Sequence, residues 1–142
     1  MKHKFMYLVG IVTLLGALAT ILTVLVWSLY DYKPIKINKE PMYVLTEEVK
    51  SGDVLIYQLD YCKFNDGDVS ISRSFVDGIV FTTPTIKASN EMGCRIQNIS
   101  ILVPETLPNG RYYLKVDYTY KVNPIREVTV TSRTEEFTVV DK

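Results

Sequence analysis

The chain has 142 residues, enough for one ordinary domain, and its 16 Lys and Arg residues balance 16 Asp and Glu residues. This balance excludes the basic excess of a nucleic-acid-binding chain, so we expect no nucleic-acid partner. The single histidine, His3, lies near the N-terminus, which removes most acid–base, triad and zinc chemistry from the remaining chain. We therefore expect a protein that is not an enzyme, with no catalytic residue, no cofactor and no metal site.

An uncharged, apolar stretch runs from Phe5 to Tyr30. As a helix, its 26 residues would extend about 39 Å, against a hydrocarbon core of about 30 Å. Two lysines precede the stretch and Trp27 lies near its end, where aromatic side chains often mark a membrane interface. We expect residues 5–30 to be an uncleaved transmembrane signal anchor that follows a cytoplasmic N-terminus of residues 1–4.

A cleavable signal peptide is the alternative, because Ala17-Leu18-Ala19 has the A-x-A form of a cleavage site. The sequence stays apolar from there to Trp27, whereas a mature N-terminus is usually polar, and this favours the uncleaved anchor. Positive charges on the two sides of the stretch are nearly equal in number. Orientation therefore depends on the large following segment, which can translocate regardless of such charges, and on its two cysteines. We expect the C-terminal domain to be extracytoplasmic.

Residues 31–40 contain Pro34 and three lysines without periodicity, which predicts a short extended stalk. From Pro41 onward, apolar and polar residues alternate and turn sequences recur, as in antiparallel strands. The expected strands are Met42–Val49, Val54–Lys63, a strand marked by Val69, Ile71 and Phe75, Ile79–Thr82, Arg95–Val103, Arg111–Val122 and Glu127–Val140. In the last of these strands the apolar residues change from even-numbered to odd-numbered positions, which predicts a β-bulge near Ser132–Glu136. A loop is expected from Pro84 to Gly93.

The run from Leu107 to Leu114, LPNGRYYL, resembles the LPxGxYxL corner of bacterial and phage immunoglobulin-like and fibronectin-like modules. Seven strands in roughly 100 residues also match an immunoglobulin-like domain. The resemblance implies an all-β fold, an immunoglobulin-like antiparallel β-sandwich of about seven strands over residues 41–142, preceded by one N-terminal transmembrane α-helix. It implies a fold and no function. One anchor with one such domain is also similar to membrane proteins encoded by tailed phages.

In an immunoglobulin-like sheet, Cys62 would end one strand and Cys94 would begin its antiparallel neighbour. Two cysteines in a domain outside the membrane suggest one disulfide. Each cysteine has the parity opposite to the apolar residues of its strand, so the bond is expected on the outer face. Two free thiols in a cytosolic domain, or a copper(I) site with Met92, are the alternatives. The copper site lacks the usual histidine ligands.

Most of the ten tyrosines fall at the alternating strand positions that are expected to face the core, which leaves Tyr43 and Tyr113 as candidate surface contacts. Adjacent carboxylates such as Glu135 and Glu136 are expected to point to opposite faces of a strand, and Asn65–Asp68 reads as a turn. We expect a membrane-anchored protein that displays its domain to an unknown protein partner or to the envelope. The alternative is a structural or assembly subunit whose helix packs in a larger membrane complex.

Overall fold

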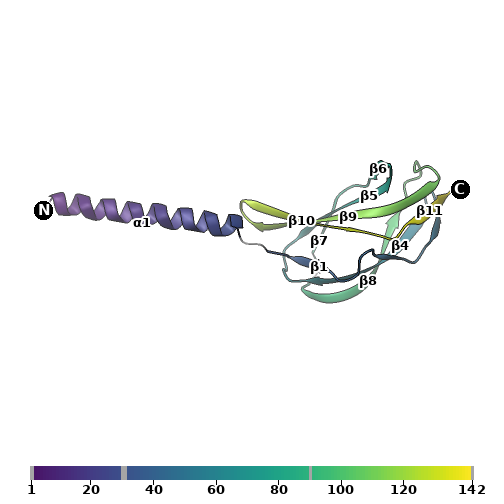
Figure 1. The fold of residues 1–142 in the computed structure, drawn as a ribbon, viewed down its shortest axis with the longest axis horizontal. Helices are drawn as coiled ribbons and strands as arrows, with labels where there is room; N and C mark the ends of the chain where they lie inside the picture. The colour runs from purple at the N-terminus through teal and green to yellow at the C-terminus, as the bar shows by residue number, and fades with distance from the viewer. Residues whose placement is uncertain (1, 30–31, 90, 142) are drawn as a thin grey trace. The chain divides into compact units, whose positions relative to one another are not determined.

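The computed structural model describes residues 2–29, 32–89 and 91–141. Within these residues one helix, α1 (Lys2–Leu29), is followed by eleven strands (Figure 1). The strands are β1 (Ile35–Ile37), β2 (Tyr43–Val44), β3 (Glu48–Lys50), β4 (Val54–Lys63), β5 (Val69–Asp77), β6 (Ile79–Thr82), β7 (Ile86–Ala88), β8 (Gly93–Leu102), β9 (Gly110–Asn123), β10 (Arg126–Arg133) and β11 (Phe137–Val140). The all-β class with one N-terminal apolar helix is therefore confirmed.

Contacts divide the chain into two compact units, Met1–Tyr32 with Asn123–Arg126, and Lys33–Val122 with Glu127–Lys142. In the first unit, Lys4–Leu29 is long and apolar enough to cross a membrane, a test that a signal sequence also passes. The hydroxyls of Thr20 and Thr23 donate hydrogen bonds to the carbonyls of Gly16 and Ala19, both at 2.9 Å. These polar groups are thus satisfied within the helix, as an apolar environment requires. Tyr30, the last residue of the expected span, lies outside the described residues.

The first sheet is centred on β4. Strand β8 pairs with β4 antiparallel along its whole length, from Val54 opposite Leu102 to Lys63 opposite Gly93. The short strands β1 and β2 pair with β4 along its other edge. The side chains of β4 alternate between buried and more exposed positions, because every second residue from Leu55 to Tyr61 is leucine or tyrosine and faces the second sheet.

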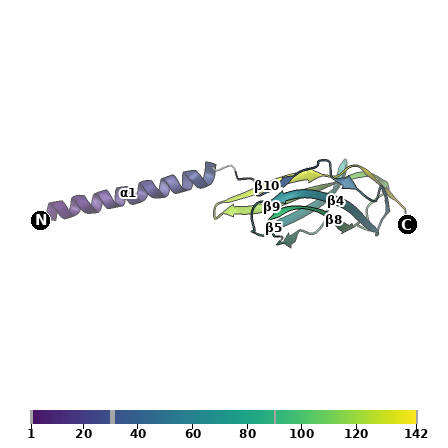
Figure 2. The ribbon, with the colours of Figure 1, turned by 90° about the horizontal axis from the view of Figure 1, so that it is seen from below.

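The second sheet is centred on β9, the longest strand. Strand β5 pairs with β9 antiparallel on one side, while β10 and β11 pair with it as well. Strands β6 and β7 extend the sheet from β5, and β3 extends it from β11 in parallel orientation. Figure 2 labels β4 and β8 of the first sheet and β5, β9 and β10 of the second, and the buried side chains of both sheets form one core.

In one half of the core, the buried side chains are apolar. Phe75 and Phe137 meet edge to face with their ring centroids 6.1 Å apart, and the fully buried side chains of Leu55, Val103 and Leu114 belong to the same core. Such burial stabilises the fold by about 1.5–3 kcal/mol for each large apolar side chain. The other half of the core is lined by tyrosines and charged side chains.

The expected stalk is corrected by the structure, because part of it belongs to the first sheet. Ile35 is 4% exposed and Pro34 is buried. The carbonyl of Pro34 accepts a hydrogen bond from the backbone N–H of Phe64 at 2.9 Å, and β1 continues the pairing. The β domain therefore begins before Pro41. Proline interrupts a helix, but its carbonyl can still accept a hydrogen bond in an extended edge strand. Pro34 therefore did not exclude strand pairing in the segment that we expected to be a stalk.

The number and direction of strands also differ from the expectation of about seven antiparallel strands. Met42–Val49 is divided into β2 in the first sheet and β3 in the second, and β3 runs parallel to β11. The expected loop after Pro84 contains β7. The expected strand Glu127–Val140 is divided into β10 and β11. Burial passes from Ser132 and Thr134 to Phe137 and Val139, so the buried face shifts where expected, but at a break between two strands in place of the predicted β-bulge.

Candidate functional site

A groove of about 310 Å³ lies on the outer face of the second sheet, at the junction of β10 and β11. Side chains from β9, from this junction and from the segment before β2 line it: Tyr113, Arg133, Thr134, Glu135, Glu136 and Pro41. Tyr113, one of the two tyrosines expected as surface contacts, is half-buried in this groove. A hollow of this volume is at the small end of the range for ligand-binding clefts.

One wall of the groove is held by Met42, which inserts beside the β10–β11 junction. Its backbone N–H donates to the carbonyl of Arg133 at 2.8 Å, and the N–H of Glu135 donates to the carbonyl of Met42 at 2.9 Å. The side chain of Met42 is 1% exposed, so it anchors this segment in the core. The carboxylate of Glu40 accepts a further bond from the N–H of Arg133 at 3.2 Å. These contacts keep Pro41 next to the junction.

The break between β10 and β11 comes from Thr134. Its N–H donates to the carbonyl of Leu114, and its hydroxyl oxygen accepts from the N–H of Leu114, both at 2.9 Å. A side-chain oxygen thus takes the place that a backbone carbonyl oxygen has in the regular hydrogen-bond ladder of a sheet. Glu135 and Glu136 consequently lie outside both strands, and both line the groove. Our expectation that they point to opposite faces of a strand is therefore wrong.

The groove combines an aromatic ring, a guanidinium group and two carboxylates. Tyrosine and arginine are the side chains that most often carry binding energy at protein interfaces. The carboxylates of Glu135 and Glu136 would accept a basic group from a partner. Among the described residues, no group of three or more His, Cys, Asp and Glu side chains is placed to hold a metal ion. The arrangement is suited to recognition of a polypeptide segment.

Tyr43, the second expected surface contact, lies on β2 in the first sheet. It is 41% exposed, and the ammonium of Lys39 lies 5.6 Å from the centroid of its ring, within the range of a cation–π contact. Tyr43 is not among the side chains that line the groove. The two tyrosines therefore lie on different sheets and do not act as one contact.

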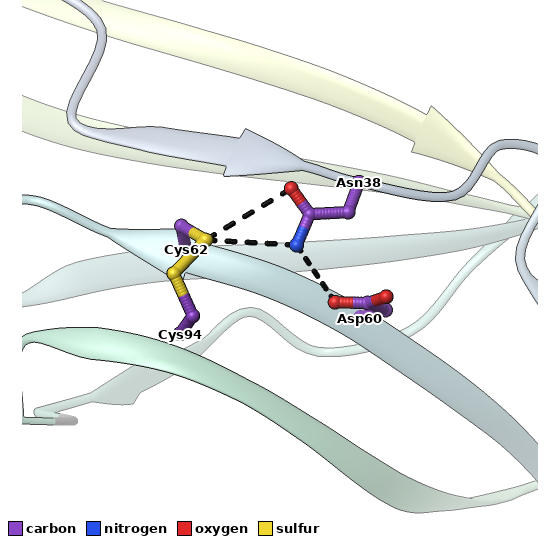
Figure 3. The surroundings of a disulfide bond; sticks show 4 residues. All are labelled: Asn38, Asp60, Cys62 and Cys94. Carbon is purple, nitrogen blue, oxygen red and sulfur yellow. Dashed lines mark hydrogen bonds between the residues drawn. A yellow bond between two sulfur atoms is a disulfide. The ribbon is translucent and has the colours of Figure 1, made fainter.

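Cys62 and Cys94 form a disulfide, as the strand pairing predicts (Figure 3). They are directly opposite each other on β4 and β8, with Cα atoms 3.9 Å apart. The amide of Asn38 lies against this bond: its Nδ2 donates to Asp60 at 2.7 Å and lies 3.5 Å from the sulfur of Cys62. Cys94 is exposed and Cys62 half-buried, so the bond is on the outer face of the first sheet.

The sequence analysis expected most tyrosines in the core but missed the charged side chains that lie among them. Tyr57, Tyr118 and Tyr120 are at most 3% exposed, and Lys63 is 2% exposed. Arg73 is half-buried on β5, and its Nε donates to the hydroxyl of Tyr57 at 3.4 Å. A sequence signal for this cluster exists, because Lys63 and Arg73 share parity with the buried residues of β4 and β5.

Burial affects the acidity of these phenols. It raises the pKa of Tyr57, Tyr118 and Tyr120 because the ionised form would lose its hydration. For Tyr57, the neighbouring Arg73 guanidinium opposes part of this effect. The pKa of Tyr120 rises to about 12. All three groups therefore keep their protons at neutral pH and remain hydrogen-bond donors.

No family model matches the chain, and no curated protein matches it. A structure of a protein of unknown function from Porphyromonas gingivalis W83 is similar, with a TM-score of 0.43 and 14% identity over 77% of this chain and 49% of that one. The alkylpurine DNA glycosylase AlkC of Pseudomonas fluorescens, bound to DNA with an abasic site analog, has a TM-score of 0.44 and 10% identity. That match covers 77% of this chain and 31% of the glycosylase. The chain thus spans about half and about a third of these two proteins.

The expectation that the chain is not an enzyme is corrected by this comparison, because one structural neighbour is itself an enzyme. A scarcity of histidine in the sequence is too weak a criterion for such an exclusion, since fold and composition do not determine chemistry. At 10% identity, the activity of the glycosylase remains a statement about that protein.

Proposed function

We propose that this chain is a single-pass membrane protein that holds an immunoglobulin-like domain outside the cytoplasm for binding another protein. The groove around Tyr113 is the contact surface in this proposal. The observation that carries it is the gathering of Tyr113, Arg133 and two carboxylates in one hollow on an otherwise regular sheet. Interface hot spots are built from such aromatic and arginine side chains in a recess.

The immunoglobulin-like assignment is supported by strand order and by one hydrogen bond. The first sheet joins β4 to β8, and the second joins β9 to β5 on one side and to β10 and β11 on the other. The hydroxyl of Tyr112 donates to the carbonyl of Pro108 at 3.0 Å, at the start of β9. A tyrosine that bonds back to the preceding corner is a recurrent feature of immunoglobulin-like sandwiches.

The orientation is supported by the disulfide. Stable disulfides form in oxidising compartments and are rare in the cytosol, so the bond between Cys62 and Cys94 favours an extracytoplasmic domain. Helix α1 would then cross the bilayer with its N-terminus in the cytoplasm. The hydroxyls of Thr20 and Thr23 bond to their own helix, so they provide no argument for a partner helix.

Two experiments test this proposal. In the first, protease is added to intact spheroplasts: digestion of the β domain is expected, with a protected fragment that retains α1. A soluble product that begins after Ala19 would show instead that α1 is a cleaved signal sequence, and full protection would contradict the orientation.

In the second experiment, a photo-crosslinking amino acid replaces Tyr113 in the full chain in its native cells. A discrete adduct is expected at this position. The matched control replaces Ser100, an exposed residue on the outer face of β8, and should give no such adduct. The variant Arg133→Ala should weaken the adduct at position 113. Equal adducts at both positions, or none, would contradict binding through the groove.

A further inference from the structure

Strand β8 forms one edge of the first sheet, and one side of this strand is open. Among residues 2–29, 32–89 and 91–141, β8 pairs only with β4, in a register that is regular from Gly93 to Leu102. It forms the lower margin of the domain in Figure 1. An open edge strand offers a row of unpaired N–H and C=O groups to a further strand.

The other sheet edges carry the features that usually prevent such pairing, namely short strands and charged side chains. Strands β1, β2, β3, β6 and β7 have at most four residues each, and β10 has three charged side chains. In contrast, β8 has ten residues, no proline and one charged side chain, that of Arg95. Its sequence from Ile96 to Leu102, IQNISIL, is uncharged. The open edge of β8 is therefore the least protected edge of the described part of the domain.

Backbone hydrogen bonds show which residues of β8 face the open side. The N–H of Val103, the next residue, donates to the carbonyl of Asp53 at 2.9 Å, and its carbonyl accepts from the N–H of Gly52 at 3.1 Å. Both groups of Val103 thus point toward the side of β4, and this direction alternates along a strand. The even-numbered residues from 96 to 102 consequently turn their N–H and C=O groups to the open edge: Ile96, Asn98, Ser100 and Leu102.

The side chains of these four residues follow a palindromic pattern on the outer face of the sheet. Ile96 and Leu102, at the two ends, are 64% and 63% exposed, and the polar Asn98 and Ser100 lie between them, also exposed. If two such strands pair antiparallel about Ile99, Ile96 of one copy lies opposite Leu102 of the other, and Asn98 lies opposite Ser100. Pairing about Asn98 would instead place Ile96 opposite Ser100. The register about Ile99 therefore matches apolar with apolar and polar with polar side chains, which stabilises cross-strand pairs.

Backbone hydrogen bonds and charge are compatible with the same register. Two opposed residues whose backbone groups point toward each other exchange two hydrogen bonds, so the four pairs would form about eight. Arg95, which is ion-paired with Glu91 of its own chain, would lie opposite Val103 of the second copy, so like charges do not meet. The next charged residue along the second copy is the exposed Glu105, which is opposite in sign to Arg95.

We propose that β8 is a self-association surface through which two copies of this chain pair antiparallel, about a two-fold axis at Ile99. The first sheets of the two copies would then join into one continuous sheet. Each copy contributes one strand edge, a small interface, so a weak and concentration-dependent dimer is expected. The proposal is independent of the function proposed above, because β8 contributes no residue to the groove around Tyr113.

Sedimentation equilibrium of the full-length protein in detergent tests this proposal, and we expect a monomer–dimer equilibrium. Ser100→Pro removes an N–H that points to the open edge and spares the ladder with β4. It should lower the association constant about tenfold or more, with an unchanged circular dichroism spectrum. The matched control Ser100→Ala keeps the N–H and should associate like the wild type. A monomer at every concentration would overturn the proposal, and so would a dimer that survives in Ser100→Pro, since another surface would then hold the copies together.

Cysteine variants test the register and do not depend on the folding of Ser100→Pro. Ile96→Cys and Leu102→Cys alter exposed side chains, and no cysteine is free among the residues that the structure describes. After mild oxidation, a mixture of the two variants should give disulfide-linked dimers, because their Cα atoms would lie about 5.5 Å apart across the pair. Each variant alone should give none beyond the wild type, because its two copies of the new thiol would be about 20 Å apart. Equal crosslinking in the single variants and in the mixture would overturn the proposal.

Photo-crosslinking in the native cells identifies the occupant of this edge. A photo-crosslinking amino acid at position 100 should join two copies of this chain. That adduct would have twice the mass of one chain, which distinguishes it from an adduct between position 113 and another protein. An adduct of position 100 with a different protein would show that β8 pairs with another partner, and self-association would then be wrong.

Discussion

The phenol hydroxyl of Tyr112 donates a hydrogen bond to the carbonyl oxygen of Pro108, four residues earlier, at 3.0 Å. The ring of Tyr112 is 3% exposed, so this bond fastens the corner before β9 to the edge of the core. The residues between them, Asn109 and Gly110, turn the chain into the strand. The corner is thereby joined to the centre of the second sheet.

The variant Tyr112→Phe should keep the fold and lose about 1 kcal/mol of stability, the usual net contribution of one hydrogen bond. For a domain of this size, the melting temperature should fall by roughly 4–8 °C. Thermal unfolding followed by circular dichroism checks this. The control Tyr113→Phe alters the neighbouring outward side chain and should change the melting temperature less. An equal loss in both variants would mean that the corner bond has no special role.

Replacing Cys62 and Cys94 together with serine should destabilise the domain without changing its fold, because neither side chain belongs to the core. The bond closes a separation of 32 residues, which corresponds to about 3–4 kcal/mol in the chain-entropy model. A fall in melting temperature on the order of 10–20 °C follows from this. Wild-type protein in reducing agent should behave like the double variant. An unchanged melting temperature in both would contradict the expected stabilisation.

The junction between β10 and β11 depends on the hydroxyl of Thr134. Thr134→Val should cost about 1–3 kcal/mol, because the buried N–H of Leu114 would lose its acceptor. Thr134→Ser keeps the acceptor and should lose less stability. Urea unfolding of the two variants measures the difference. If serine, which lacks the methyl group, were more destabilising than valine, the packing of that methyl group, and not the hydrogen bond, would be the main contribution of this residue.

Alkaline pH should unfold the domain through its buried tyrosines. The unfolded phenols lose their protons near pH 10, whereas burial raises the pKa of Tyr57 and Tyr118 and brings that of Tyr120 to about 12. Above pH 10 the unfolded state therefore binds fewer protons than the folded state, and stability falls as pH rises. The stabilisation is fully present below about pH 10 and is lost as pH rises through the folded pKa values.

The free energy of unfolding should fall by about 1.4 kcal/mol per pH unit for each proton that the folded state retains and the unfolded state has lost. Urea unfolding between about pH 9 and pH 11 measures it. Tyr120→Phe should reduce the slope, whereas the exposed Tyr43→Phe should leave it unchanged. A flat profile across this range would contradict the raised pKa values.

The sequence alone was sufficient for the apolar helix and the long strands, whereas the opposition of the two cysteines was implied only by the resemblance to an immunoglobulin-like sheet. The helix and the strands depend on local periodicity: β4 and β9 alternate so strictly that only one face of each can be buried. The parity shift before Phe137 was also readable, because an inserted residue changes the face of every later side chain.

The remaining features were decided by the tertiary structure, because they depend on which distant segments meet. The pairing of β1 with β4 brings the expected stalk into the first sheet, and the insertion of Met42 beside Thr134 creates the groove around Tyr113. Neither leaves a periodic signal, since a short edge strand contributes too few residues to show one. The inward parity of Arg73 was visible in the sequence. Only the packing of β4, β5 and β9 shows which groups Arg73 meets. The buried tyrosines line the same hollow as Arg73, and its guanidinium group donates to the hydroxyl of Tyr57.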